Sequence, residues 1–353
     1  MSVEVSWFSA LCDDDYQYLG VHDPALKSSW SHCRDITLAA ERNGYDNILL
    51  PSGYTLGIDS VSFAAGIAAL TERMRLLVAV RCGELWVPQL ARQLATLDQM
   101  LGGRLTVNII SSDIPGETLA SEPRYQRTRE TMQALRALLN GEAIDSQGDF
   151  VSLQLDPPNA RTVSGRCPPL YFGGLSDPAR AVAAECADVF LMWPDTLPNV
   201  QALLDDMRSR AATHQRQLKF GYRVHVVVRE TEDQAIDAAN NLLRHLDDAE
   251  GAAIRQRSLD SQSAGVNRQA TLRESSSTDG FAEPHLWTGI GRARSGCGAA
   301  LVGDPDQVLA KLKAYESLGI EAFILSGYPH RDECDLFAKY VLPELDHGPL
   351  MTA

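Results

Sequence analysis

Short apolar runs alternate along the chain with amphipathic stretches. Eight of these runs are rich in β-branched and aromatic residues and have the length of a strand. They lie at 3–9, 47–53, 75–80, 104–110, 169–174, 188–193, 222–228 and 321–327. Stretches between them, such as 88–101 and 124–140, repeat apolar residues at three- and four-residue spacing, as on one face of a helix. The alternation predicts a single (β/α)8 TIM barrel over residues 1–353, with a doubly wound open sheet as the alternative.

Three turn signals place helix boundaries. Asp177 and Asp304 each stand directly before a proline, and we expect each to cap a helix whose first residue is that proline. Gly44 follows a helical stretch, and we expect it to end that helix.

One long segment, 250–283, interrupts the alternation between the seventh and eighth strands. It is polar and rich in serine, glutamine and arginine. We expect an irregular, mobile insertion. It is either a surface loop without a role or a lid over the barrel mouth, because insertions after barrel strands lie at the active-site end.

Charge and cysteine content narrow the class of protein. The net charge is −14 and no basic run occurs, which argues against nucleic acid and anionic membranes as partners. Seven cysteines without a Cys-x-x-Cys pair predict reduced thiols in a cytoplasmic protein. We see no signal peptide, and no apolar run approaches the roughly 18 residues of a membrane span. Because the chain is acidic overall, an anionic ligand would need local arginines to bind it.

Polar residues in the seventh strand are candidates for binding such an anion. Arg223 and His225 lie two residues apart, so both side chains point to the same side of the strand. Val224, Val226 and Val228 would occupy the other face of the strand and pack on the helices, which places the polar pair inside the barrel. A buried arginine is costly unless it meets an anion. The alternative is a structural ion pair with a carboxylate of the barrel.

Two further strand ends carry residues of the same kind. Tyr328 and His330 follow the eighth strand and share a side if the segment stays extended. Trp193 ends the sixth strand, where it could also belong to the core. Together with Arg223 and His225, these residues predict a pocket at the carboxyl ends of the strands.

The turn after the fifth strand is suited to a phosphate. Gly173 and Gly174 let the backbone approach closely, and Ser176 precedes a helix whose first N–H groups favour an anion. A tight strand–helix turn needs the same residues without any ligand. No metal site is predicted, because the histidines do not pair at four-residue spacing and no His-Glu-x-x-His run occurs.

The strand-end residues together resemble those of the bacterial-luciferase-like flavin-dependent monooxygenases, and most of all the alkanesulfonate monooxygenase group. The resemblance runs over almost the whole chain and is carried by YLG, PPLYFGG, RVHVVVRET, LWTGIG and ILSGYPH. It implies a barrel whose insertion closes over the site. It also implies reduced FMN, supplied by a separate NAD(P)H-dependent flavin reductase, and O2 as co-substrate. An organosulfonate would be cleaved to an aldehyde and sulfite.

The resemblance also assigns site residues by position. The sulfonate pocket would consist of Trp193, Arg223, His225, Tyr328 and His330. Arg294, after the insertion, would join Arg223, His225, Tyr328 and His330 as a catalytic residue. Tyr125 and Ser176 would hold the flavin phosphate. From their places at strand ends we add Gly174 and Ser111 to the flavin-binding residues, and Cys12 to the substrate-binding residues.

This chain departs from the family pattern at three positions. Leu56 stands where the family usually has cysteine, Cys12 where it usually has histidine, and Leu175 where it has a second serine. The residues that follow Cys12 are Asp13–Asp15, which could hydrogen-bond hydroxyl groups. A hydroxylated sulfonate such as the sugar sulfonate sulfoquinovose therefore competes with simple alkanesulfonates.

Two other functions remain as alternatives, and the sequence also leaves the oligomeric state open. The chain could be a flavin or deazaflavin oxidoreductase of this fold that acts on a non-sulfonate substrate. It could also be a flavin-binding protein without activity. We expect a homo-oligomer, either a dimer or a tetramer.

Overall fold

A closed parallel barrel forms the centre of the molecule. The computed structural model describes residues 2–256 and 263–350. The barrel strands, in spatial order, are β1 (Glu4–Phe8), β2 (Asn47–Leu50), β3 (Arg75–Arg81), β4 (Leu105–Ile110), β7 (Leu170–Phe172), β8 (Val189–Met192), β9 (Lys219–Val228) and β13 (Ala322–Ser326). Each pairs in parallel with its neighbour, and the pairing of β8 with β9 closes the ring. The predicted (β/α)8 barrel is confirmed, and the open-sheet alternative is wrong.

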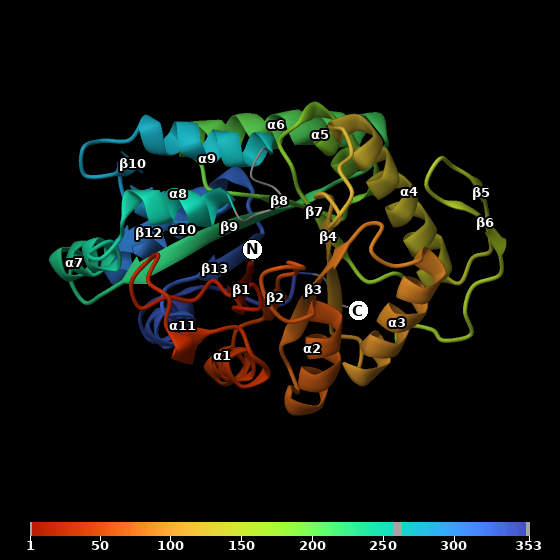
Figure 1. Cartoon of the computed structure of the whole chain (residues 1–353), viewed down its shortest axis with the longest axis horizontal. Coiled ribbons are helices and arrows are strands. Elements are labelled where there is room, and N and C mark those ends of the chain that lie inside the picture. The colour runs from red at the N-terminus through yellow and green to blue at the C-terminus, as the bar shows by residue number, and fades with distance from the viewer. Residues whose placement is uncertain (1, 257–262, 351–353) are drawn as a thin grey trace.

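Helices surround the strands on the outside of the barrel (Figure 1). They are α1 (Trp30–Asn43), α2 (Ser60–Ile67), α3 (Val87–Met100), α4 (Ser121–Asn140), α5 (Asp177–Cys186), α6 (Leu197–Thr213), α7 (Glu232–Leu242), α10 (Pro305–Leu318) and α11 (His330–Tyr340). Short 3-10 turns occur at Pro24–Leu26, Ala68–Leu70, Gly289–Arg292 and Leu342–Glu344. A hairpin of β5 (Ile144–Gln147) and β6 (Ser152–Leu155) projects beyond α4.

The helix boundaries agree with two of the three turn signals. Gly44 ends α1 in a left-handed conformation with φ of 84°. Asp304 caps α10 through a complete capping box with Gln307. The third expectation was wrong by one residue, because Ser176 caps α5 and Asp177 is already its first helical residue. A serine hydroxyl at the N-cap accepts a hydrogen bond from a backbone amide of the first turn, as an aspartate carboxylate would.

Side chains of β9 alternate between the inside and the outside of the barrel, as the sequence predicted. Val224, Val226 and Val228 belong to the main hydrophobic core between barrel and helices. Arg223 and His225 lie on the opposite side and are buried. The period of two in a strand therefore directs the polar pair into the barrel.

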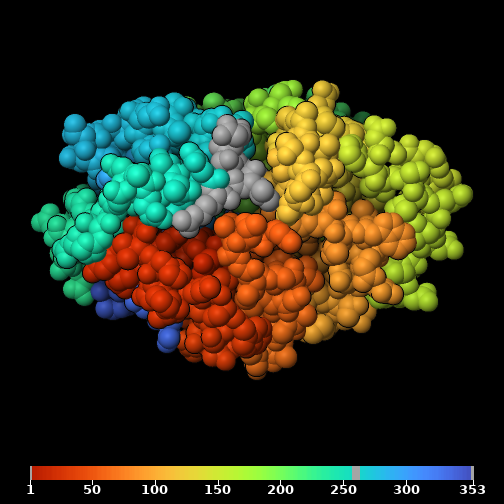
Figure 2. All heavy atoms as spheres, in the orientation of Figure 1, coloured from red at the N-terminus to blue at the C-terminus, as the bar shows by residue number. Residues whose placement is uncertain are grey.

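The insertion between β9 and β13 lies in the predicted place, but much of it is regular. It contains α8 (Asp248–Gln256), α9 (Ala264–Glu274) and three short strands: β10 (Phe281–Glu283), β11 (Leu286–Trp287) and β12 (Ala300–Gly303). The irregular conformation expected for 250–283 is therefore wrong for the two helices, while 257–262 fall outside the described residues. β12 extends the sheet alongside β9. Figure 2 shows α8 lying beside the N-terminal segment on this face of the molecule.

Two further findings concern the chain as a whole. All seven cysteines carry free thiols. No helix in the described part of the chain has the length and apolar character to span a bilayer.

Candidate active site

Five side chains that the sequence singled out meet at the carboxyl end of the barrel. Arg223 and His225 come from β9, Tyr328 and His330 from the end of β13 and the start of α11, and Arg294 from the segment after α9. The Tyr328 ring centroid lies 5.1 Å from those of both His225 and His330. Arg294 donates from Nη1 to the Tyr328 hydroxyl at 2.6 Å. We refer to these five residues as the anion cluster.

Phe8 forms the floor of the anion cluster, which the sequence analysis missed. Its ring centroid lies 4.3 Å from the Arg223 guanidinium and 5.5 Å from that of Arg294. The His330 ring stacks on it at 5.5 Å. Its position as the last residue of β1 was the only signal for it in the sequence. An aromatic face attracts both cations without neutralising their charge.

Several polar atoms of the anion cluster, both hydrogen-bond donors and acceptors, have no partner among the described residues. Arg223 is 3% exposed, and among the described residues it donates only to the carbonyls of Val224, at 3.1 Å, and Ile324, at 3.5 Å. Within the described residues, no carboxylate forms an ion pair with Arg223, and its Nη2 has no hydrogen-bond partner. Among the same residues, Nε2 of His225 and both ring nitrogens of His330 also have no hydrogen-bond partner. Because unpaired buried donors are costly, the cluster is suited to a ligand with several anionic oxygens.

Arg294, in contrast, has an internal partner. It forms an ion pair with Asp14, which lies in the loop after β1. Burial alone would lower the pKa of Arg294, but Tyr328 and Asp14 together raise it well above its ordinary value. Burial would raise the pKa of Asp14, but Arg294 and His330 hold it below its ordinary value. Both groups are therefore charged at neutral pH, and Arg223 keeps the uncompensated positive charge.

The two histidines of the cluster are neutral at pH 7. Burial lowers the pKa of His225 well below its ordinary value, and Arg223 and Arg294 lower it further. Burial also lowers the pKa of His330, against the opposing charges of Asp15 and Asp14. His225 is oriented by a 2.7 Å hydrogen bond between its Nδ1 and the Ser326 hydroxyl, which leaves Nε2 directed away from that bond.

These shifted histidines predict a pH dependence of stability. The unfolded chain takes up protons on imidazoles near pH ~6.5, whereas the folded chain does not until the pH is lower. The free energy of unfolding should therefore fall as the pH drops from about 7 through that range. His225→Asn should flatten this slope in urea titrations at several pH values. His214→Asn, which changes an exposed histidine, is the control. An unchanged slope in the His225 variant would contradict a neutral buried imidazole.

A cavity of about 180 Å³ lies beside the anion cluster and brings the predicted flavin residues together. All four of them line it: Ser111, Tyr125, Gly174 and Ser176. Trp193 lines it too, as do the first residues of α9. Trp193 follows the last residue of β8, and its neighbour Met192 pairs with Tyr222. Trp193 therefore lines the cavity from the end of β8, the strand next to the one that carries Arg223.

The turn between β7 and α5 forms a cradle that only glycine permits. A Cβ atom on Gly174 would lie 2.6 Å from Cβ of Ala179 and 3.5 Å from the Tyr125 hydroxyl. The Ser176 hydroxyl accepts from the amide of Ala179 at 3.4 Å and so stands at the helix N-terminus. Backbone N–H groups, a serine and a tyrosine hydroxyl thus surround one end of the cavity. This donor set fits the phosphate group of a flavin mononucleotide.

Two more residues line this cavity and were missed in the sequence. Within the described part of the chain, Ser112 has a buried hydroxyl and Arg124 a buried Nε without hydrogen-bond partners. Arg124 also lies over the Tyr125 ring at 5.4 Å and forms an ion pair with Asp113 at 3.4 Å. Their only sequence signal was that each is a direct neighbour of a predicted residue.

Two of the three departures from the family pattern, Cys12 and Leu56, meet in space. A Cβ atom on Gly53, in the turn after β2, would lie 3.1 Å from both Cys12 Sγ and Leu56 Cδ1. The two substituted side chains therefore pack around the same glycine. Burial raises the pKa of Cys12, as does Asp14, so this residue stays a neutral thiol. Leu175, the third departure, lines the cavity next to Ser176.

Comparisons with known proteins show the family to which this chain belongs. The family described as luciferase-like monooxygenase matches residues 4–322. A sulfoquinovose monooxygenase of Novosphingobium aromaticivorans is 62% identical over 98% of this chain and 98% of its own length. A sulfoquinovose monooxygenase of Agrobacterium fabrum is 50% identical over 98% of this chain and 90% of its own length.

Solved structures of low sequence identity share the fold. A riboflavin lyase with modified FMN and riboflavin superposes with a TM-score of 0.81 at 16% identity, covering 100% of this chain and 94% of that one. A long-chain alkane monooxygenase superposes with a TM-score of 0.77 at 16% identity, covering 98% and 91%. With the family match over most of the barrel and two relatives of high identity, the chain belongs to the luciferase-like monooxygenases.

Proposed function

We propose that this protein is a two-component monooxygenase that uses reduced FMN and O2 to cleave the carbon–sulfur bond of sulfoquinovose. The buried, unpartnered donors of the anion cluster carry the proposal, because three sulfonate oxygens would satisfy them. Two relatives named sulfoquinovose monooxygenase support the choice of substrate. A separate NAD(P)H-dependent reductase would supply the reduced flavin. Free thiols throughout the chain fit a cytoplasmic location.

The proposed reaction balances with one sulfonate, one O2 and one reduced flavin. Bound FMN, in its reduced form, would supply two electrons and activate O2. One oxygen atom becomes the aldehyde oxygen on the former sulfonate carbon, and the other leaves as water. The carbon–sulfur bond breaks, and sulfite departs with the electron pair.

The chain's own residues would bind and orient the substrate in this reaction. Arg223 would hold the sulfonate and stabilise charge that develops at the leaving sulfite. His225 and His330 would add hydrogen bonds, and Tyr328 would hold Arg294 in place through its hydroxyl. Ser176 and Tyr125 would bind the flavin phosphate, with Gly174 and Ser111 beside them. Trp193 would form one wall of the flavin cavity.

The direct test is release of sulfite from a panel of sulfonates. Reduced FMN would be generated by a flavin reductase with NAD(P)H, and sulfite would be measured for sulfoquinovose and for alkanesulfonates of increasing length. We expect sulfoquinovose to give the highest kcat/KM. Oxidation of a non-sulfonate substrate, with flavin or deazaflavin and without sulfite, would favour the alternative. Flavin binding without oxygen uptake would identify a protein that lacks activity.

Asp14 supports a hydroxylated substrate in particular. Among the residues that the structure describes, its buried Oδ1 has no hydrogen-bond partner. Its other oxygen accepts from Arg294 inside the anion cluster. A carboxylate can only accept hydrogen bonds and repels a sulfonate, so a substrate hydroxyl is a suitable donor for Oδ1. We therefore propose that Asp14 binds a sugar hydroxyl.

Asp14→Asn should reduce the preference for sulfoquinovose over a simple alkanesulfonate. A hydrogen bond to a charged group contributes about 1.5–3 kcal/mol, so the ratio of the two kcat/KM values should fall by roughly tenfold to a hundredfold. Asp13→Asn is the matched control, because that carboxylate accepts from the backbone of Ser28 instead. Equal losses on both substrates would mean that Asp14 only orients Arg294.

A homo-oligomer, either a dimer or a tetramer, is part of the proposal. Light scattering of the purified protein would measure its mass against the 38.6 kDa of one chain. A monomer at micromolar concentration would contradict this part.

A further inference from the structure

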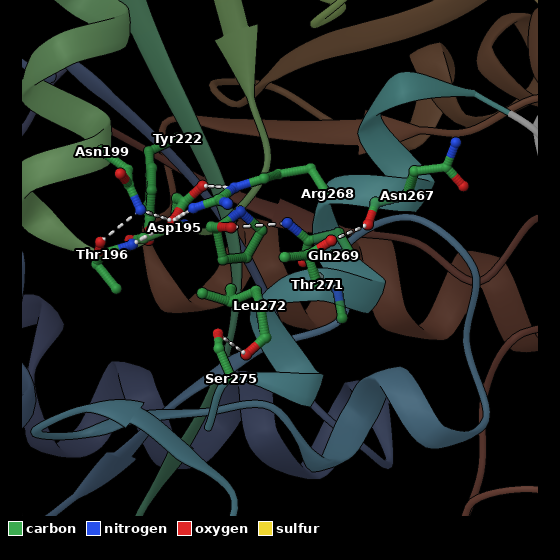
Figure 3. Close-up of polar contacts among 12 residues, drawn as sticks. Asp195, Thr196, Asn199, Tyr222, Asn267, Arg268, Gln269, Thr271, Leu272 and Ser275 are labelled. Atoms are coloured by element: carbon green, nitrogen blue, oxygen red, sulfur yellow. Dashed lines mark hydrogen bonds and ion pairs between the residues drawn. The ribbon is translucent and has the colours of Figure 1, made fainter. Parts of the chain in front are cut away.

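The insertion helix α9 is held against the end of β8 by an ion pair. Arg268 donates from Nε and Nη2 to the two carboxylate oxygens of Asp195, at 2.6 and 2.8 Å (Figure 3). The same carboxylate accepts from the Thr196 amide and from the Asn199 side chain, each at 2.8 Å. Asp195 is thereby fixed in the turn between β8 and α6. The two-pronged contact in turn fixes both the position and the orientation of α9.

The next residue, Gln269, connects α9 to both sides of the candidate site. Its side chain is buried, its Nε2 donates to the Pro194 carbonyl at 2.7 Å, and its Oε1 accepts from the Gly298 amide at 3.1 Å. Pro194 directly follows Trp193. Gly298 directly follows Cys297, whose thiol contacts the Arg223 carbonyl at 3.4 Å. One amide side chain therefore spans the strand end that carries Trp193 and the segment that carries Arg294.

The Trp193 ring is packed between these two segments. A Cβ atom on Gly265, in the first turn of α9, would lie 2.8 Å from the ring. A Cβ atom on Gly296 would lie 3.0 Å from it on the other segment. The start of α9 also lines the cavity that the predicted flavin-binding residues line. The position of α9 thus determines the position of Trp193 and of one wall of the cavity.

Polar contacts, and not an apolar face, hold α9 in place. The residues that the helix buries are Gly265, Gln269 and Leu272, of which only leucine has a large apolar side chain. A single buried leucine contributes about 1.5–3 kcal/mol, which is little for docking eleven residues. Breaking the contacts of Gln269 or Arg268 should therefore release the helix locally without unfolding the barrel.

We propose that Gln269 and Arg268 are positioning residues that hold α9 and Trp193 against the flavin cavity and so keep oxygen use coupled to sulfite release. The coupling part rests on the proposed function. A displaced wall would admit water to the cavity. The two electrons of the reduced flavin would then reduce O2 to hydrogen peroxide, with two protons, and no sulfite would form.

Two measurements on the full-length protein test this inference. The first is amide hydrogen exchange of Ala264–Glu274, without flavin or substrate. The second is the ratio of sulfite to hydrogen peroxide with sulfoquinovose, a flavin reductase, FMN and NADH. Gln269→Leu keeps the size of the side chain and removes both hydrogen bonds. We expect exchange in α9 to be at least about tenfold faster and the sulfite fraction to fall at least about threefold, with unchanged exchange in the barrel strands.

Further variants separate the contacts and guard against misfolding. Gln269→Glu retains an acceptor for the Gly298 amide but loses the donor to Pro194, and should give an intermediate result. Arg268→Ala should resemble Gln269→Leu, and Arg268→Lys should recover part of the coupling, since lysine keeps the charge without the fork. Asn267→Ala, at an exposed position of the same helix, is the control and should match the wild type.

The outcomes distinguish the two proposals. Unchanged exchange in both Gln269→Leu and Arg268→Ala would overturn the proposed role in holding α9. Faster exchange with an unchanged sulfite fraction would overturn the role in coupling. If the wild type released no sulfite from any sulfonate, the proposed function would fail, and the exchange measurement would still decide whether these residues hold α9.

Discussion

Arg223→Ala is expected to nearly eliminate sulfite release while the barrel stays folded. Arg223 is the buried cation of the cluster that lacks a carboxylate partner among the described residues, so a sulfonate has most to gain from it. Charged hydrogen bonds of about 1.5–3 kcal/mol predict a loss of at least tenfold to a hundredfold in kcat/KM. The loss should be larger if the guanidinium also stabilises the departing sulfite. Sulfite release and circular dichroism of the same preparation would measure both parts.

Two variants make this result specific. Arg223→Lys should recover little activity, because an ammonium group cannot offer two parallel hydrogen bonds to a sulfonate. Arg73→Ala removes an arginine whose side chain is 77% exposed and should leave activity unchanged. Near-normal kcat/KM on sulfoquinovose in Arg223→Ala would show that the sulfonate binds elsewhere.

Gly173→Ala is expected to destabilise the barrel at the cofactor cavity. An added Cβ atom would lie 1.8 Å from the Leu191 carbonyl oxygen, which is backbone of the neighbouring strand β8. Neither group can rotate away, so β7 and β8 must separate. Such overpacking costs typically about 1–3 kcal/mol, and a clash with backbone belongs at the upper end. Urea unfolding should show a loss of about 3 kcal/mol, and FMN binding should weaken because the turn to Ser176 moves.

Gly348→Ala provides the comparison for this variant. The nearest atom to its Cβ would be the Ser2 hydroxyl at 3.3 Å, a side-chain end that can rotate. Its free energy of unfolding should stay within about 0.5 kcal/mol of the wild type. If Gly173→Ala did the same, the contact between β7 and β8 would be less constrained than the structure indicates.

Local patterns in the sequence were enough to predict the barrel and the direction of several site residues. Eight strands were found because buried parallel strands are continuous apolar runs, and this signal depends on neighbouring residues alone. The inward direction of Arg223 and His225 followed from the period of two. Asp304 and Gly44 marked helix ends because caps are also local. Even the error at Asp177 was a shift by a single residue, to the adjacent serine.

The insertion shows where local patterns fail. Its composition predicted an irregular loop, because polar residues give no apolar period. The structure instead has two helices there, one of which is held by Arg268 and Gln269 through contacts with residues 73 and 75 positions earlier in the chain. A helix that polar contacts hold, with one buried leucine, does not show the repeated spacing of apolar residues by which helices are predicted from sequence.

Patterns along the chain were enough to predict the fold, the family and a set of strand-end residues. How these residues group became visible only in three dimensions: the anion cluster lies over Phe8, and a separate cavity is lined by Tyr125 and Ser176. The tertiary structure also showed that Arg294 is neutralised by Asp14, 280 positions away, whereas Arg223 has no carboxylate partner among the described residues. The physical reason is that charge pairing and burial depend on distances between strands at the barrel mouth. Closure of the barrel sets those distances, and no spacing along the chain encodes them.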